Sequence, residues 1–104
     1  MTKLEKLPKP VRDLLEDVKK YKPEKIILFG SYATGKPKKD SDVDLLVIKK
    51  TKKGLLDRQR EIVDCLLSSV PSDIIVLTPE EFEQSSKEPN YFMREILQYG
   101  KVIL

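Results

Sequence analysis

Three short apolar runs, at residues 26–29, 45–48 and 74–77, constrain the fold of this chain most strongly. Each run holds four consecutive Ile, Leu, Val or Phe residues, far fewer than the roughly 20 that a membrane span needs. This length is typical of strands, which we expect over 25–29, 43–48 and 73–77. Because the first strand is a continuous apolar run, we expect both of its faces to be buried.

Helical patterns separate these strands. A first helix is predicted between Pro8 and Pro23, a second over 55–70, and two more that begin after the capping residues Thr78 and Asn90. The second helix has one predicted apolar face, made of Leu55, Leu56, Ile62, Val63, Leu66, Leu67 and Val70. A short edge strand is expected over 101–104. The alternation predicts an α/β (α+β) fold with a small mixed sheet flanked by helices, without fixing the strand order.

The composition excludes several kinds of catalytic site. The 104 residues include one cysteine, Cys65, and no histidine. A single cysteine forms no internal disulfide and no cysteine-based zinc site, and Ser-His-Asp or Cys-His catalysis needs histidine. Chemistry must therefore rest on carboxylates, hydroxyls, lysines, arginines and bound ions. With no secretory signal pattern and no second domain, we expect one cytoplasmic domain over 1–104 that does not enter a membrane.

Charge is distributed unevenly along the chain, whose formal net charge is +3. Residues 1–54 carry 15 Lys and Arg against 8 Asp and Glu, whereas residues 55–104 carry 5 against 9. A basic half attracts nucleotides, nucleic acids or acidic partners, although a solvated lysine surface explains the same pattern. No aromatic residue is interleaved with the lysines of 49–53, so nucleic acid is an unlikely direct partner.

Two neighbouring motifs carry the chemistry. Gly30 and Ser31 follow the first strand, and a glycine there lets a phosphate approach the backbone while the serine hydroxyl donates to it. Asp42 and Asp44 are two apart at the start of the second strand, so both carboxylates face one way. A simple turn and two solvated aspartates would give the same sequence. Asp73, at the start of the third strand, can join them if the two strands are neighbours, and three carboxylates can hold two Mg²⁺ ions.

Gly30-Ser31, ten further residues and Asp42-x-Asp44 together resemble the G-S-x10-D-x-D signature of the polymerase-β-like nucleotidyltransferase superfamily. The segment 30–48, GSYATGKPKKDSDVDLLVI, is similar to its small stand-alone branch, the minimal nucleotidyltransferases of the MntA antitoxin type. Asp73 matches the third carboxylate of that family, and the closing residues 99–104, YGKVIL, are also similar. The resemblance covers nearly the whole chain and implies the polymerase-β-like fold.

The resemblance also implies a reaction. Gly30 and Ser31 would bind the triphosphate of ATP, while Asp42 and Asp44 would bind two Mg²⁺ ions and Asp73 the catalytic one. An acceptor hydroxyl would then take AMP, and pyrophosphate would leave. In the stand-alone branch the implied acceptor is a tyrosine of a HEPN-type RNase toxin, which makes such a protein a type VII antitoxin.

Two other hypotheses stay open at this stage. The chain could neutralise a partner by contact alone, with nucleotide binding vestigial, and its uneven charge would suit such an interface. It could also bind nucleic acid through the lysines of 36–53, with an affinity that falls steeply with salt. A homo-oligomer formed through the edge strand at 101–104 is a further hypothesis.

Overall fold

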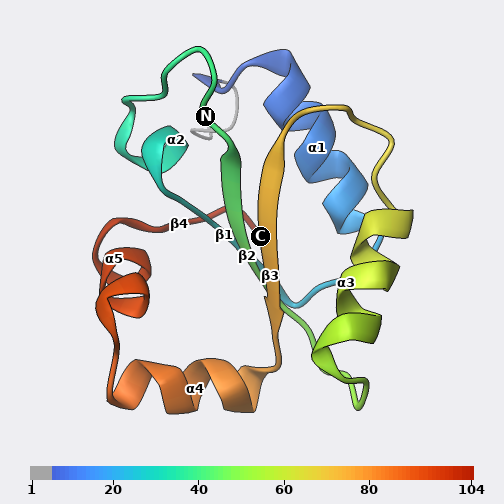
Figure 1. Cartoon of the computed structure of the whole chain (residues 1–104), viewed down its shortest axis with the longest axis vertical. Coiled ribbons are helices and arrows are strands. Elements are labelled where there is room, and N and C mark those ends of the chain that lie inside the picture. Colours follow the sequence, from blue (N-terminus) through green and yellow to red (C-terminus); the bar gives the residue numbers. More distant parts are fainter. Residues whose placement is uncertain (1–5) are drawn as a thin grey trace.

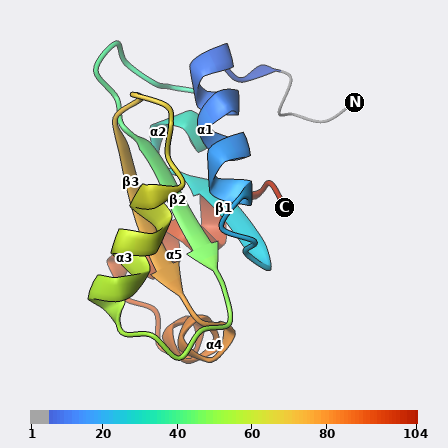
Figure 2. The same ribbon diagram turned by 90° about the vertical axis from the view of Figure 1, so that its right-hand side faces the viewer.

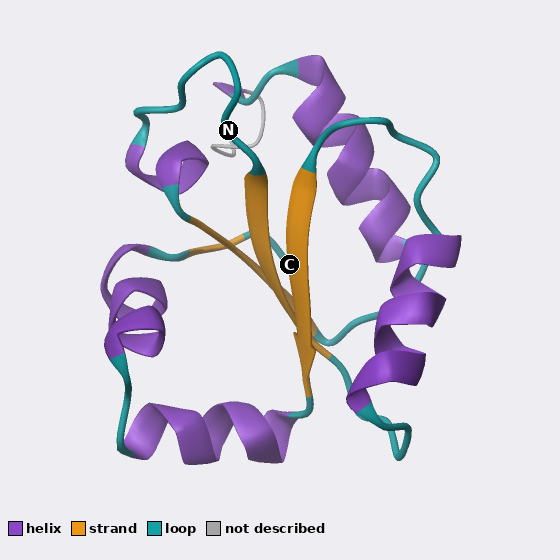
Figure 3. Cartoon of the chain, viewed as in Figure 1, coloured by secondary structure: helices purple, strands orange, loops and turns teal. Residues whose placement is uncertain are grey.

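The computed structural model describes residues 6–104, which form one four-stranded sheet with helices on both faces (Figure 1). Figure 3 shows the strands at the centre and the helices around them. The elements in chain order are α1 (Lys9–Lys19), β1 (Lys25–Phe29), α2 (Ser31–Thr34), β2 (Val43–Ile48), α3 (Leu55–Asp64), β3 (Ser72–Leu77), α4 (Pro79–Lys87), α5 (Tyr91–Tyr99) and β4 (Lys101–Val102). All three predicted strands are confirmed, as is the mixed α/β class.

The strand order is β3-β2-β1-β4. β1 pairs antiparallel with both β2 and β4, whereas β2 and β3 are parallel. The two inner strands, β1 and β2, are almost entirely buried, as expected for a strand covered on both faces. β4 has only two residues, so the predicted edge strand over 101–104 is shorter than its apolar sequence indicates.

Two hydrophobic cores lie on opposite faces of the sheet, because successive strand residues point to opposite sides. The larger core joins α1 and α3 to the sheet, and Figure 2 shows both helices on that side of the strands. Its strand residues are Ile26, Leu28, Val43, Leu45, Val47, Ile74 and Val76. The smaller core lies under α5 and consists of Ile27, Phe29, Leu46, Ile48, Met93 and Ile96. Alternate residues along each strand therefore belong to different cores, one on each face of the sheet.

The helix after β2 differs from its prediction in length and in orientation. α3 ends at Asp64, and the turn that follows carries Leu66 and Val70, which pack against the larger core. Within α3, the residues turned inward are Ile62 and Arg58, whose exposed fractions are 0% and 6%. The predicted apolar face is therefore wrong for Leu55, Leu56, Val63 and Leu67, all of which are exposed.

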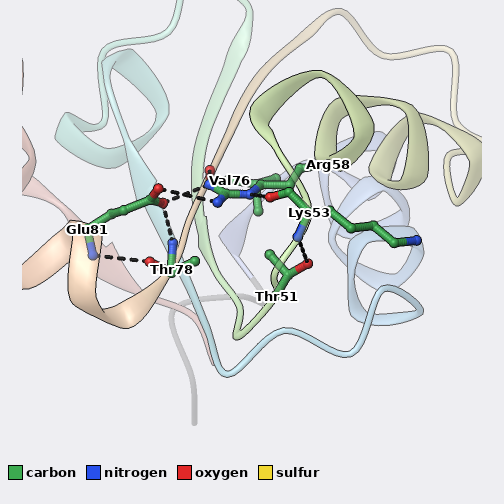
Figure 4. Close-up of polar contacts among 6 residues, drawn as sticks. All are labelled: Thr51, Lys53, Arg58, Val76, Thr78 and Glu81. Carbon is green, nitrogen blue, oxygen red and sulfur yellow. Dashed lines mark hydrogen bonds and ion pairs between the residues drawn. The ribbon is translucent and has the colours of Figure 1, made fainter.

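Arg58 occupies the inner position because its guanidinium group joins three segments (Figure 4). Its Nε donates to the carbonyl of Lys53 at 2.8 Å, and its Nη1 donates to Glu81 at 2.7 Å and to the carbonyl of Val76 at 3.4 Å. Glu81 also accepts the backbone N–H of Thr78 in a capping box that begins α4. Hydrogen bonds from Arg58, followed by that from Thr78, hold the pKa of Glu81 below its usual value. Arg58 thus fastens α3 and α4 to the outer edge of β3.

A second buried charge fixes the turn after α3. Asp17 on α1 is 6% exposed, and its Oδ2 accepts the backbone N–H groups of Leu67 and Ser68, each at 2.9 Å. These two hydrogen bonds, opposed in part by burial, lower the pKa of Asp17 from its usual value of 3.8. The contact ties α1 to a segment 50 residues later in the chain.

Replacing Asp17 with alanine should lower the free energy of unfolding at pH 7 by about 1–3 kcal/mol, since two backbone N–H groups lose their charged acceptor. Because folding lowers the Asp17 pKa, its charge stabilises the protein above pH 3.8 and this stabilisation disappears as the pH falls through the lower folded value. Urea unfolding of both proteins across pH 2–7 would measure this. Asp17→Asn keeps an acceptor oxygen, so it should be less destabilised at pH 7 than Asp17→Ala. If the difference in free energy of unfolding between wild type and Asp17→Ala did not depend on pH, the role assigned to the Asp17 charge would be contradicted.

Candidate active site

The parallel pairing of β2 with β3 places Asp44 directly opposite Asp73. Asp44 lies two residues before Leu46 on β2, and Asp73 lies two residues before Ile75 on β3. Because Leu46 and Ile75 belong to the smaller core, both carboxylates point to the face that carries α5. Asp44 is half-buried and Asp73 is exposed. The sequence hypothesis that Asp73 lies beside Asp44 required these strands to be neighbours, and the sheet order confirms that they are.

Gly30 lies against the Asp44 carboxylate from the other neighbouring strand. Phe29, the last residue of β1, pairs with Asp44, and Gly30 follows with φ +73°, a conformation that side chains rarely adopt. A Cβ atom built on Gly30 would lie 2.1 Å from Asp44 Oδ2. The absence of a side chain at Gly30 is therefore what allows the carboxylate its position. This is a physical reason for glycine that the sequence did not reveal.

Ser31 is the first residue of α2 and is half-buried. The carbonyl of Gly30 accepts the N–H groups of Ala33 and Thr34, so the chain turns from β1 into a single helical turn at this point. The predicted strand-to-helix turn at Gly30-Ser31 is confirmed as a local structure. Its assignment to triphosphate binding stays a prediction.

Asp42 lies in the loop just before β2 and is exposed. The next residue, Val43, donates its N–H to the carbonyl of Pro71, which joins the loops that precede β2 and β3. Within residues 6–104, no group of three or more His, Cys, Asp or Glu side chains converges closely enough to hold a metal ion. The structure thus brings Asp44 and Asp73 together, with Asp42 farther out, and the assignment of all three as metal ligands stays a prediction.

The charge on Asp44 is not compensated by the surrounding protein. Burial raises its pKa above the usual value of 3.8, and repulsion from Asp73, Asp42 and Glu95 raises it further. Glu95, a half-buried residue of α5, was missed by the sequence analysis because nothing in a single helical glutamate indicates which strand it faces. Four acidic residues therefore contribute to one electrostatic environment.

A divalent cation fits this donor set. Mg²⁺ in proteins takes one or two carboxylates and completes its shell with water and phosphate oxygens, so the pair Asp44 and Asp73 suffices as protein ligands. A bound cation would also relieve the repulsion that raises the Asp44 pKa. Asp42, at the rim, has the right chemistry to join the pair.

Several polar and aromatic residues close to the motifs in sequence lie elsewhere. Lys36, Lys38 and Lys39 are exposed in the loop between the two motifs, and Tyr32 packs against the larger core. Arg58 is engaged with Glu81 and the edge of β3, so it does not face the carboxylates. The predicted site thus consists of the two motifs and Asp73, without a basic side chain from α3.

Comparison with known proteins decides the family. The family model for the nucleotidyltransferase domain matches residues 11–103. The chain is a nucleotidyltransferase. The match includes the Gly-Ser turn, both strands that carry the aspartates, and the closing helix with β4. This assignment confirms the resemblance seen in the sequence and the class of enzyme that it implied.

A curated relative extends over nearly the same length. It is a Methanocaldococcus jannaschii protein named "Putative protein adenylyltransferase MJ0141", which is 31% identical over 97 residues. The alignment covers 93% of this chain and 91% of the relative.

Solved structures share the fold. A crystal structure of a "putative nucleotidyltransferase" from Sulfolobus solfataricus has a TM-score of 0.56 and 26% identity, over 72% of this chain and 75% of that one. A toxin–antitoxin structure with AMP-PNP has a TM-score of 0.60 and 20% identity, over 93% and 73%. A mutant of the MntA–HpeT toxin–antitoxin has a TM-score of 0.54 and 21% identity, over 99% and 73%. The polymerase-β-like nucleotidyltransferase fold is therefore that of this protein.

Gly30→Ala should displace the Asp44 carboxylate and abolish nucleotidyl transfer, because the new methyl group and Oδ2 cannot share the same space. Gly35→Ala is a matched control, since Gly35 also has a positive φ, +77°, but a Cβ there meets nothing within 4 Å. Gly35→Ala should lose about 1 kcal/mol of stability to left-handed backbone strain. Gly30→Ala should lose more, about 1–3 kcal/mol, because Gly30 has ψ −155° in a region that is essentially restricted to glycine. Only Gly30→Ala should lose activity in addition, and equal activity in the two variants would contradict the proposed contact.

Proposed function

We propose that this nucleotidyltransferase is a Mg²⁺-dependent enzyme that transfers AMP from ATP to a hydroxyl group of a partner protein. The single observation that carries the proposal is that Asp44 and Asp73 lie opposite each other on neighbouring strands. Gly30, which has no side chain, lies beside Asp44. This arrangement provides adjacent carboxylates for cations and, next to them, a strand-to-helix turn for phosphate groups. The 104-residue chain acts in this proposal as one catalytic domain.

In the proposed mechanism, the turn at Gly30-Ser31 binds the triphosphate through backbone N–H groups and the serine hydroxyl. Asp42, Asp44 and Asp73 would hold two Mg²⁺ ions. The chemistry that these ions supply when bound is neutralisation of the carboxylates and of the charge that develops on the phosphate oxygens. Asp73, which is exposed, accepts the proton of the incoming hydroxyl. The hydroxyl oxygen then bonds to the α-phosphorus, the bond from that phosphorus to the bridging oxygen breaks, and pyrophosphate leaves.

We propose a protein acceptor, specifically a tyrosine of a HEPN-type RNase toxin, which would make this chain a cytoplasmic antitoxin. The name of the M. jannaschii relative, a protein adenylyltransferase, supports adenylyl transfer to protein. The toxin–antitoxin neighbours, one of them solved with AMP-PNP, support a toxin partner and an adenine nucleotide.

Neutralisation of a partner by contact alone is the second candidate. The acidic balance of residues 55–104, with 9 Asp and Glu against 5 Lys and Arg, favours an electrostatic interface with a basic protein. We prefer the enzymatic candidate to neutralisation by contact. An inhibitor that acts by contact alone would not need two carboxylates opposite each other, one of which, that of Asp44, has a raised pKa.

Incubation of the chain with α-labelled ATP, Mg²⁺ and an extract of the source cells should transfer label to a protein. Asp42→Asn/Asp44→Asn should abolish that transfer, since the cation site loses two charged ligands. Asp40→Asn, in the exposed loop before the motif, is the matched control and should keep full activity. Label recovered in RNA would contradict a protein acceptor. A wild-type chain that transfers no label while still suppressing its toxin would contradict the enzymatic proposal and favour contact.

A further inference from the structure

Two partly buried carboxylates have no partner in the protein. Within residues 6–104, the Asp and Glu side chains that are at least partly buried are Asp17, Asp44, Glu61, Glu81 and Glu95. Backbone N–H groups hold Asp17, a lysine pairs with Glu61, and an arginine pairs with Glu81. In the same part of the chain, no hydrogen bond or ion pair holds Asp44 or Glu95. Burial of a charge without a partner costs free energy, so this pair needs an explanation of its own.

Contacts at both ends fix the position of α5 against the sheet. Asn90 caps its start by accepting the N–H of Met93 at 2.8 Å, and Met93 and Ile96 are buried in the smaller core. Gly100, just after the helix, lies so close to β1 that an added Cβ would be 2.8 Å from Ile27 Cγ2. α5 is therefore held firmly on this face, and each of its sides has a defined direction.

One side of α5 is turned toward Asp44. Phe29 is paired with Asp44 in the antiparallel ladder of β1 and β2, so both side chains lie on the same face of the sheet. Phe92 of α5 packs edge-on against Phe29, with the ring centroids 5.3 Å apart. Glu95 follows Phe92 by three residues and thus lies on the same side of the helix. Its charge reaches Asp44, where it adds to the repulsion that raises the pKa of that carboxyl.

This side of α5 is also open to solvent near the Gly30-Ser31 turn. Gln98, three residues after Glu95, lines a surface hollow together with Thr34 of α2 and Lys36 just beyond it. Figure 1 shows α2 close to the end of α5. Because Glu95 is only partly buried, its carboxylate is accessible to water and ions.

The distances in the acidic group favour an indirect role for Glu95. Within residues 6–104, no three carboxylates converge closely enough to bind one metal ion directly. Mg²⁺ held by one or two carboxylates keeps several water molecules, which donate hydrogen bonds. Groups that accept such hydrogen bonds orient the ligands and raise the affinity for the metal. A charged acceptor just beyond Asp44 has the chemistry for this role.

We propose that Glu95 is a positioning residue of the cation site, and that it accepts hydrogen bonds from the hydration shell of a cation held by Asp44 and Asp73. This role rests on the proposed function, since it requires a cation at that pair. It adds a residue of α5 to a site whose other groups come from the strands and the turns next to them. It also explains why Glu95 has no partner in the protein, because the hydrated cation supplies one.

Mn²⁺ binding to the full chain tests this role without catalysis. Electron paramagnetic resonance measures free Mn²⁺ during a titration and gives a dissociation constant for each variant. Glu95→Gln should weaken binding about tenfold, as the loss of an outer-shell partner does. Glu88→Gln is the matched control and should bind like wild type. It removes the same charge from an exposed residue at the end of α4 that does not contribute to the raised pKa of Asp44. Unchanged binding in Glu95→Gln would overturn the inference.

A shorter carboxylate separates hydrogen bonding from long-range charge. Glu95→Asp keeps the charge but ends one methylene group nearer the helix. It should therefore weaken Mn²⁺ binding toward the level of Glu95→Gln. A Glu95→Asp variant that binds like wild type would show that the charge alone suffices, and would overturn the role in hydrogen bonding.

The Mg²⁺ dependence of label transfer excludes a merely structural role. Glu95→Gln should need about ten times more Mg²⁺ for its half-maximal rate and should approach the wild-type rate at saturating Mg²⁺. Its thermal stability in EDTA should not fall, because no partner is lost. A rate that stays low at every Mg²⁺ concentration would overturn the inference.

Failure of the proposed function would look different. A wild-type chain that binds no Mn²⁺, or an Asp44→Asn variant that binds it as tightly as wild type, would show that the cation site itself is wrong. The role of Glu95 would fall with it. Tight binding by wild type and weak binding by Asp44→Asn, with Glu95→Gln unchanged, would overturn the role of Glu95 alone.

Discussion

The in-register pairing that sets Asp44 opposite Asp73 is the constraint on which the candidate site depends. Parallel pairing of β2 and β3 sets these carboxylates in register on one face, and burial of Asp44 adds to the cost of its charge. Nothing in the fold requires two acids there, because each strand needs only its apolar residues to hold the sheet together. The fold thus carries an unfavourable local charge that a bound cation would neutralise, as is common where a site is shaped for chemistry rather than for stability.

The rest of the fold keeps that pair in place. β1 supports Asp44 from the other side, and Gly30 leaves room for its carboxylate. Separate cores on the two faces fix the alternation of the strands, so a one-residue slip of β2 would bury Asp44 in the wrong core. Arg58 and Asp17 brace the outer elements at a distance from the site.

Much of this was predictable from local sequence. The strands follow from continuous apolar runs, and the α4 start follows from the Thr78 capping box. Gly30-Ser31 and Asp42-x-Asp44 predicted the candidate site residues because their spacing resembles that of the family signature. The orientation of α3 was not predictable, because burial of Arg58 depends on Val76 and Glu81, which lie 18 and 23 residues away. Similarly, the sheet register places Gly30 against Asp44 and the packing of α5 brings the charge of Glu95 near it, and neither leaves a local pattern in the sequence.

The most direct test of the uncompensated charge is a carboxyl-carbon NMR titration of Asp44 in the full chain, first in EDTA and then with Mg²⁺. The account predicts an Asp44 pKa above 3.8 in EDTA, raised by burial and by repulsion from Asp73, Asp42 and Glu95. It also predicts that Mg²⁺ lowers this pKa, since the cation favours the charged form. A pKa at or below 3.8 in EDTA, or one that does not respond to Mg²⁺, would contradict the claim that Asp44 and Asp73 form a site for a cation.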